Sequence, residues 1–180
     1  MFWSPVTCMR LCTVALLLVA SAQGRHCTDS CCLFVENFPA RLKQLRASFD
    51  KIRQYYQAND DLEFALLDEN VLQDFKTPFG CHAIQEVLRF YLDDVLPAAE
   101  QKVHENYKEP IDVIGNIFND LKKQVTHCKK FFSCKKPFAL DSIMTTYKSM
   151  QNKGLYKAMG ELDLLFNYIE EYLVSKKKRH

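Results

Sequence analysis

The side chains in this sequence that could do chemistry are its histidines and cysteines. A histidine paired with a cysteine thiolate can support nucleophilic catalysis. His82 and His127 each neighbour a cysteine, but both cysteines are more simply explained as disulfide partners. The sequence contains no phosphate-binding glycine loop and no nucleophile elbow. We therefore expect no catalytic residue, no cofactor and no enzymatic activity.

A cluster near the N-terminus combines His26 with Cys27, Cys31 and Cys32. Zinc bound by these four residues is one interpretation, but their spacing fits no structural zinc pattern well and the secretory pathway favours disulfides. The adjacent pair of cysteines is similar to that of secreted phospholipases, but the His-Asp dipeptide that should follow is missing. We therefore expect no metal site.

The N-terminus predicts secretion. Arg10 precedes the apolar run LCTVALLLVASA, which ends in an A-x-A cleavage site at Ala22. The run is too short for a good membrane span, although an uncleaved anchor is the alternative. We expect residues 1–22 to be a signal peptide and residues 23–180 to form one secreted, extracellular domain without membrane insertion.

The number of cysteines and the charge of the chain further restrict the functions that the mature protein can have. Cys8 and Cys12 leave with the signal, and an even number remains, which implies disulfides whose pairing the spacing does not decide. The full sequence has a net charge of only +2, and the mature chain is nearly balanced once Arg10 is removed, so nucleic-acid binding is not indicated. The run KKKR, residues 176–179, predicts a solvated tail, and the alternative is a weak site for sulfated polysaccharide.

The elements that must position any site are helices. Pro39 suits the first turn of a helix with Asn37 as its cap. One stripe at spacings of three and four is apolar: Leu42, Leu45, Phe49, Ile52 and Tyr56. A parallel stripe is polar, either an ordered binding face or an ordinary solvated flank: Lys43, Arg46, Asp50, Arg53 and Gln57.

Similar apolar patterns follow to the end of the chain. They predict helices over about residues 63–75, 79–96, 110–128, 138–150 and 154–173, and no strand pattern of useful length is present. The last helix carries one continuous apolar stripe, while Leu164 and Tyr168 fall on its opposite side beside Lys157 and Glu161. What covers those two residues is left open. The fold class is all-α, with about six helices in a bundle.

Four stretches resemble the interleukin-10 family of helical cytokines: LKQLRASFDKI in the first helix, DFKTPFGC, HCKKFFSC and GLYKAMGELDLLFNYIEEYL. The resemblance covers nearly all of residues 31–176 and fits a protein of a vertebrate host or of a virus. It implies a six-helix cytokine bundle in an intertwined, domain-swapped homodimer, in which the fifth and sixth helices pack on the partner. It also implies two disulfides, Cys31–Cys128 and Cys81–Cys134. Cys27–Cys32 is our hypothesis for the third, with a free or intermolecular thiol as the alternative.

The connection over residues 129–136 offers a physical reason for swapping. It is short, and Cys134 would tether it to the third helix. We expect that such a link prevents the fifth helix from folding back on its own chain, so that exchange with a partner satisfies the apolar stripes.

The resemblance further implies a secreted anti-inflammatory cytokine that clusters interleukin-10 receptor chains, activates JAK-STAT signalling and suppresses inflammatory cytokine production. Carried over by position, the receptor alpha-chain site comprises Lys43, Arg46, Arg53, Gln57, Glu63, Lys157, Gly160, Glu161, Asp163 and Glu170. For the shared beta chain the implied residues are Arg41 and Lys51. Two alternatives are a monomeric helical cytokine of the wider family and a secreted helical carrier of lipid or another apolar ligand.

Overall fold

The protein is a bundle of helices in the computed structural model, which describes residues 27–135 and 140–177. Each of the six expected segments contains a helix, and the described residues contain no strand. The predicted signal peptide lies outside the described residues and stays a prediction. The chain divides into two units after Ser30, and the helical bundle belongs to the unit that begins at Cys31.

The first helix, α2 (Ser30–Ala58), begins nine residues earlier than expected and contains Pro39 in its interior. An internal proline removes a hydrogen bond and costs roughly 3 kcal/mol. The apolar spacing nevertheless continues backward from Leu42 through Phe38, Val35 and Cys31, all of which are buried. The disulfide Cys31–Cys128 also fixes this end of α2 to the end of α6. Burial and the cross-link offset the proline, so the predicted start at Pro39 was wrong.

The second helix is shorter than expected. α3 spans Glu69–Lys76, and Asp68 caps it by accepting the Val71 N–H at 2.9 Å. Residues 59–68 form a loop instead of the first turns of a helix. Leu66 and Leu67 are buried in that loop, so the apolar side chains were predicted correctly to be interior but their backbone was not predicted to be irregular.

The third segment continues through its proline. α4 (Gly80–Phe90) passes into a π-helical turn, η1 (Tyr91–Val95), and then into α5 (Leu96–Lys102). Pro97 lacks an N–H and its ring would meet a carbonyl one turn earlier; a wider π turn at this point makes room for it. Both faces of this segment are buried, as the sequence predicts.

The remaining helices complete the bundle. α6 (Glu105–His127) begins before Pro110, which was the expected start, and α7 (Asp141–Ser149) leads through the 3₁₀ turn η2 (Gln151–Lys153) to α8 (Gly154–Gly160) and α9 (Leu162–Lys177). The expected single last helix is therefore two, separated at Glu161. Its apolar stripe is buried as predicted: Leu155, Met159, Leu162, Phe166, Ile169 and Leu173.

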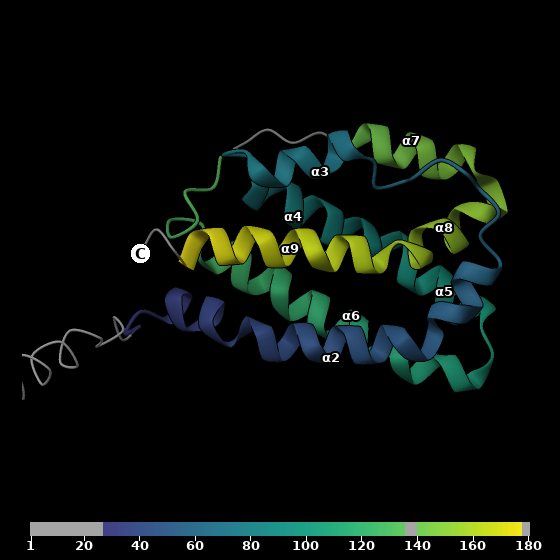
Figure 1. Cartoon of the computed structure of the whole chain (residues 1–180), viewed down its shortest axis with the longest axis horizontal. Helices are drawn as coiled ribbons and strands as arrows, with labels where there is room; N and C mark the ends of the chain where they lie inside the picture. The colour runs from purple at the N-terminus through teal and green to yellow at the C-terminus, as the bar shows by residue number, and fades with distance from the viewer. Residues whose placement is uncertain (1–26, 136–139, 178–180) are drawn as a thin grey trace, which may run out of the picture. The chain divides into compact units, whose positions relative to one another are not determined.

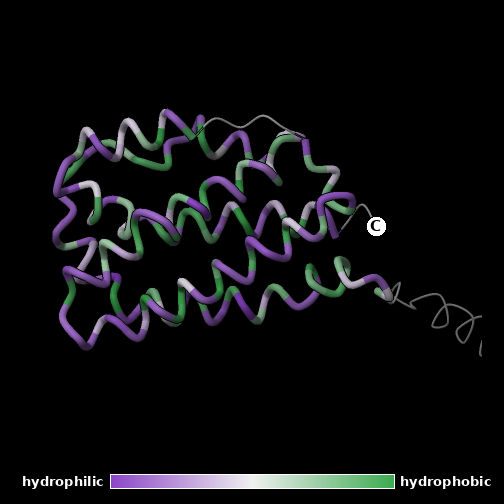
Figure 2. Tube along the Cα trace, turned by 180° about the vertical axis from the view of Figure 1, so that it is seen from behind, coloured by the Kyte–Doolittle hydropathy of each residue, from purple (hydrophilic) through white to green (hydrophobic). Residues whose placement is uncertain are grey.

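Figure 1 shows α9 lying between α2 and α3, with α4 and α6 behind it. Edge-to-face rings join these layers, because Phe166 of α9 packs on Phe49 of α2 and on Phe118 of α6. Figure 2 shows hydrophilic and hydrophobic residues alternating along the helices, as amphipathic helices around one core require.

The last two helices therefore pack on their own chain in this structure. The same contacts can form within one chain or between two chains, so the expected exchange stays a prediction; residues 136–139 of the link lie outside the described residues. The link is tied down by Cys81–Cys134. Ser133 beside it has a φ of 52°, a left-handed conformation uncommon for a residue other than glycine.

The basic C-terminus is less solvated than expected. α9 continues through Lys177, Lys176 is buried with its ammonium 4.8 Å from the centre of the Tyr172 ring, and Lys177 pairs with Glu36 of α2 at 3.7 Å. The end of the KKKR run lies outside the described residues.

Candidate protein-interaction face

The polar stripe of α2 gives one exposed edge of the candidate site. Its members recur every three or four residues, which places them on one helix face beside the buried stripe. Lys43 and Gln57 are exposed, and Arg46 and Arg53 are half-buried. Polar and charged residues therefore follow the C-terminal half of α2, the helix that lies below α9 in Figure 1.

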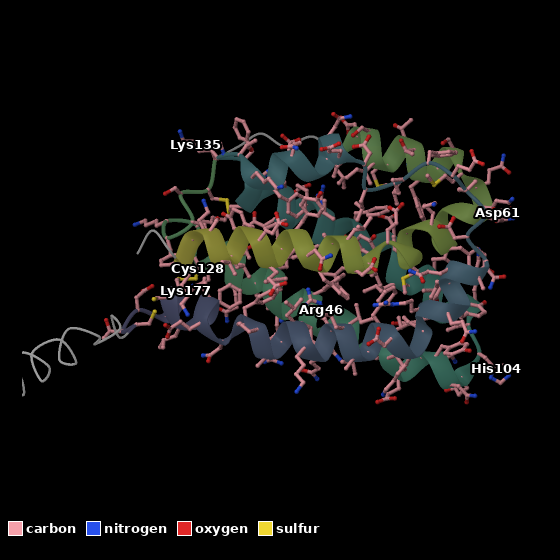
Figure 3. The ribbon with its side chains drawn as sticks, viewed as in Figure 1. Arg46, Asp61, His104, Cys128, Lys135 and Lys177 are labelled. Atoms are coloured by element: carbon pink, nitrogen blue, oxygen red, sulfur yellow. A yellow bond between two sulfur atoms is a disulfide. The ribbon has the colours of Figure 1, made fainter. Side chains whose placement is uncertain are left out.

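Arg46 joins this edge to α9. Its Nη2 donates to Asn167 Oδ1 and to Glu170 Oε2, both at 2.9 Å. Asn167 and Glu170 are three residues apart on α9, so both acceptors face the same way. Figure 3 shows Arg46 between the two ribbons. The side chains of Arg46 and Glu170 keep about two fifths of their surface, so a partner can still reach them.

Arg53 is held by a different pair of contacts. Its Nη2 lies 3.0 Å from Asp50 Oδ1, and the centre of its guanidinium lies 4.9 Å from the centre of the Phe49 ring. An arginine stacked on an aromatic ring and paired with a carboxylate has few orientations left. Its side chain is thus pre-ordered at the surface.

The end of α2 approaches the end of α8 closely. Gln57 Nε2 donates to the Gly160 carbonyl at 3.3 Å. A Cβ at Gly160 would lie 3.7 Å from Gln57 Cγ and 3.8 Å from Asp60 Oδ2, which is ordinary contact. Gly160 is therefore covered by α2 and the following loop.

The loop of residues 59–68 is anchored to α8 and α9 by a buried ion pair. The Lys157 ammonium donates to the Leu62 carbonyl at 2.6 Å and lies 2.8 Å from Asp60 Oδ2. The Glu161 carboxylate accepts the backbone N–H groups of Leu66 at 3.1 Å and Leu67 at 2.8 Å. These side chains supply the partners that a helix would otherwise give this backbone, which explains why the segment is a loop.

Burial raises the pKa of Glu161 above the usual carboxyl value. The N–H groups of Leu67 and Leu66 and the Lys157 ammonium act in the opposite direction, because they favour the ionised form. Removing either charge would therefore leave buried polar groups without a partner.

The burial of Lys157 and Glu161 corrects one expectation. The two residues are only 7% and 8% exposed, and Gly160 is also buried, so these residues do not form an outer surface of this chain. They position the loop instead. The sequence carried one signal of this arrangement, an oppositely charged pair four residues apart on one helix.

The other expected residues remain at or near the surface. Glu63 is exposed on the loop, and Asp163 is half-buried and accepts the Leu164 N–H at 2.9 Å. Among the contacts of the described residues, none joins Lys43 or Glu63 to the rest of the set. The structure thus brings together Arg46 with Glu170, Gln57 with Gly160, and Lys157 with Glu161.

The question of what covers the far side of α9 has two answers. Tyr168 packs edge-on against Phe75 of α3, with ring centres 6.1 Å apart, and the Lys76 ammonium lies 5.5 Å from its ring centre. Leu164 remains 38% exposed.

A second surface lies where α2 meets α6. Arg41 lies 3.9 Å from Asp120, and Lys51 lies 3.5 Å from Glu109. All four side chains are more than half exposed, so these pairs contribute little to stability and remain available to a partner.

The cysteines of the conceivable zinc cluster are used otherwise. Cys27, Cys31 and Cys32 are all disulfide-bonded, and His26 lies outside the described residues. The partners of Cys27 and Cys32 stay a prediction. Residues 27–135 and 140–177 contain no group of His, Cys, Asp and Glu side chains suited to a metal ion. Over the same residues, no helix has the length and apolar character needed to cross a membrane.

The sequence of this chain is similar to those of known proteins. A family model described as Interleukin 10 matches residues 8–175. Interleukin-10 of Gallus gallus is 42% identical over 176 residues, which is 95% of this chain and 100% of that protein. Interleukin-10 of Felis catus is 35% identical over 172 residues, 93% of this chain and 96% of that protein. A viral interleukin-10 homolog of equine herpesvirus 2 is 34% identical over the same shares.

Proposed function

This chain belongs to the interleukin-10 family of cytokines, and from that premise we propose that it is a secreted anti-inflammatory cytokine. It binds and clusters interleukin-10 receptor chains, which activates JAK-STAT signalling and suppresses inflammatory cytokine production. Residues 1–22 act as the signal peptide that directs secretion. A cytokine of this family signals by binding and needs no catalytic residue.

The alpha chain of the receptor binds the face formed by α2, the loop of residues 59–68 and α9. The observation that carries this proposal is Arg46, which links α2 to Asn167 and Glu170 of α9 while staying partly exposed. Lys43, Arg53, Gln57, Glu63 and Asp163 extend the same contact surface. Lys157, Gly160 and Glu161 act from beneath by holding the loop in position. Mixed charges on such a face favour specificity and fast association.

The beta chain binds the separate surface where α2 meets α6, through Arg41 and Lys51. Two receptor types then approach different sides of the same first helix. Phosphorylation between receptor-bound kinases follows when both chains are held in one complex.

The active form is an intertwined homodimer. Helices α7, α8 and α9 of one chain, which correspond to the expected fifth and sixth helices, take the place of those of the partner, so that contacts such as Phe49–Phe166 form between subunits. Domain swapping needs no new interface, because the same side chains meet in either arrangement. Lys176 contacts the Tyr172 ring and Lys177 pairs with Glu36. Any binding of sulfated polysaccharide would therefore depend mainly on the basic residues that follow Lys177.

Binding of the mature, oxidised protein to an immobilised ectodomain of the interleukin-10 receptor alpha chain tests the proposal. Arg46→Ala should weaken binding by more than about 1 kcal/mol, roughly fivefold, because it removes a central cation from the face. Arg41→Ala is the matched control, an exposed arginine of the same helix on the α6 side, and should bind like wild type. Unchanged binding by Arg46→Ala would move the site, and absence of wild-type binding would reject the function.

A further inference from the structure

Phe64 is the most exposed large apolar side chain of the described residues. It keeps 54% of its surface, compared with 44% for Val174 and 40% for Leu33. A single exposed apolar residue is common on protein surfaces and by itself indicates nothing. The surroundings of Phe64 distinguish it from the others.

The loop that carries Phe64 is held on both sides of it. Two residues before, the Leu62 carbonyl accepts from the Lys157 ammonium at 2.6 Å. Two residues after, the Leu66 N–H donates to the Glu161 carboxylate at 3.1 Å. Lys157 and Glu161, which make these two contacts, are both buried. The aromatic ring is thus displayed on a backbone that is already ordered, and less conformational entropy is lost when a partner binds it.

The charge next to Phe64 indicates what kind of partner fits. Glu63 is exposed and forms no ion pair with any of the described residues, whereas the nearby Asp60 and Asp61 pair with Lys157 and Lys153. A free carboxylate beside an exposed ring suits an apolar pocket with an arginine at its rim. Such an arginine can pair with the carboxylate and stack on the ring.

The loop is also continuous with the proposed receptor face. Asp60 lies next to Gly160, which binds Gln57 at the end of the polar stripe of α2. The loop that carries Phe64 therefore begins at the end of the stripe that holds Arg46, Arg53 and Gln57, so a protein bound to that stripe would contact the start of the loop.

We propose that Phe64 is an apolar anchor of this interface, inserted into an arginine-rimmed apolar pocket of the receptor alpha chain. The inference rests on the proposed function and adds a residue that the family resemblance did not suggest. Aromatic anchors in well-ordered settings are the usual centres of binding energy in protein interfaces.

The test compares Phe64→Ala and Phe64→Leu with wild type for binding to the alpha-chain ectodomain. Phe64→Ala should bind about tenfold more weakly or worse, and Phe64→Leu should fall between, because leucine keeps apolar volume but offers no ring to a cation. Val174→Ala, an exposed apolar residue of α9, is the matched control and should stay within about twofold of wild type. Denaturation midpoints should be unchanged, since Phe64 is largely exposed.

The outcomes separate the two proposals. Absence of wild-type binding would reject the receptor function itself. Wild-type binding that Phe64→Ala leaves within about twofold would reject only the anchor, as would an equal loss in Val174→Ala. A Phe64→Ala variant that loses dimeric mass while each subunit keeps its receptor affinity would assign the ring to a second copy of the chain and would also overturn the proposal.

Discussion

At the residue scale, Glu161 is the side chain on which the loop of residues 59–68 most depends. Glu161→Ala would leave the N–H groups of Leu66 and Leu67 without their buried acceptor and would remove a carboxylate 3.9 Å from the Lys157 ammonium. We expect a loss of about 2–4 kcal/mol in the free energy of unfolding. Glu161→Gln keeps one carbonyl acceptor and should lose less. Urea denaturation measures both changes.

Glu171→Ala provides the control for this prediction. Glu171 is on α9 and, like Glu161, lies near a lysine, Lys76 at 3.4 Å, but the side chains of Glu171 and Lys76 are both more than half exposed. Its loss should change the free energy of unfolding by less than about 0.5 kcal/mol. Equal effects of Glu161→Ala and Glu171→Ala would mean that the buried pair does not hold the loop.

The raised pKa of Glu161 predicts an unusual dependence on pH. Its folded-state pKa lies above the unfolded value, so the folded protein binds the proton more tightly between the two. Stability from this group therefore increases as pH falls through that window and is lost as pH rises through the raised pKa. Carbon-13 NMR titration should place the pKa of Glu161 above the usual carboxyl value. Glu105 is the internal comparison, because its hydrogen bond with Lys108 lowers its pKa. A Glu161 pKa at or below the usual value would contradict the burial seen here.

At the element scale, replacing each of two helical glycines by alanine should change stability in opposite directions. A Cβ at Gly80 would lie 2.2 Å from the Phe75 carbonyl oxygen and 2.8 Å from Tyr172 Cε2. Gly80→Ala therefore requires α3 and α4 to separate, and we expect a loss of roughly 3 kcal/mol or more.

Gly115→Ala, in the middle of α6, is the counterpart. The nearest atom to its Cβ would be Leu96 Cδ1 at an ordinary 3.5 Å, and alanine stabilises a helix interior by about 0.5–1 kcal/mol relative to glycine. Thermal denaturation should show a lower melting temperature for Gly80→Ala and an equal or higher one for Gly115→Ala. The reverse order would be inconsistent with the packing of α3 on α4.

At the scale of the whole molecule, the connection between α6 and α7 decides which chain the last helices join. A six-residue insertion after Lys135 lowers the strain of returning to the same chain, and we expect monomers by light scattering. The unaltered chain should be dimeric. An insertion variant that stays dimeric would show that the length of this connection does not drive the exchange.

Much of the fold could be predicted from the sequence. The apolar stripes of α2, α6 and α8–α9 follow a period of 3.6 residues, and that period depends only on local geometry. Even the early start of α2 was readable, because Cys31, Val35 and Phe38 continue the same spacing. Pro39 and Pro110 misled the prediction of both helix starts, since proline marks a first turn only when burial does not outweigh its cost.

The polar face could not be assigned in the same way. A stripe shows which side of a helix is apolar. The sequence pattern of a lysine or a glutamate on the other side is the same whether water or a loop covers that side chain. Lys157 and Glu161 are buried because a loop 95 residues earlier supplies their partners.

The sequence by itself thus determined the helical class and the position of the core stripes, and through its family resemblance the pairing of Cys31 with Cys128 and of Cys81 with Cys134. Only the tertiary structure decided that residues 59–68 are a loop, that Lys157 and Glu161 lie beneath it, and that Phe64 stands exposed upon it. Each of those outcomes depends on contacts between segments far apart in the chain, where desolvation and long-range hydrogen bonding outweigh local propensity.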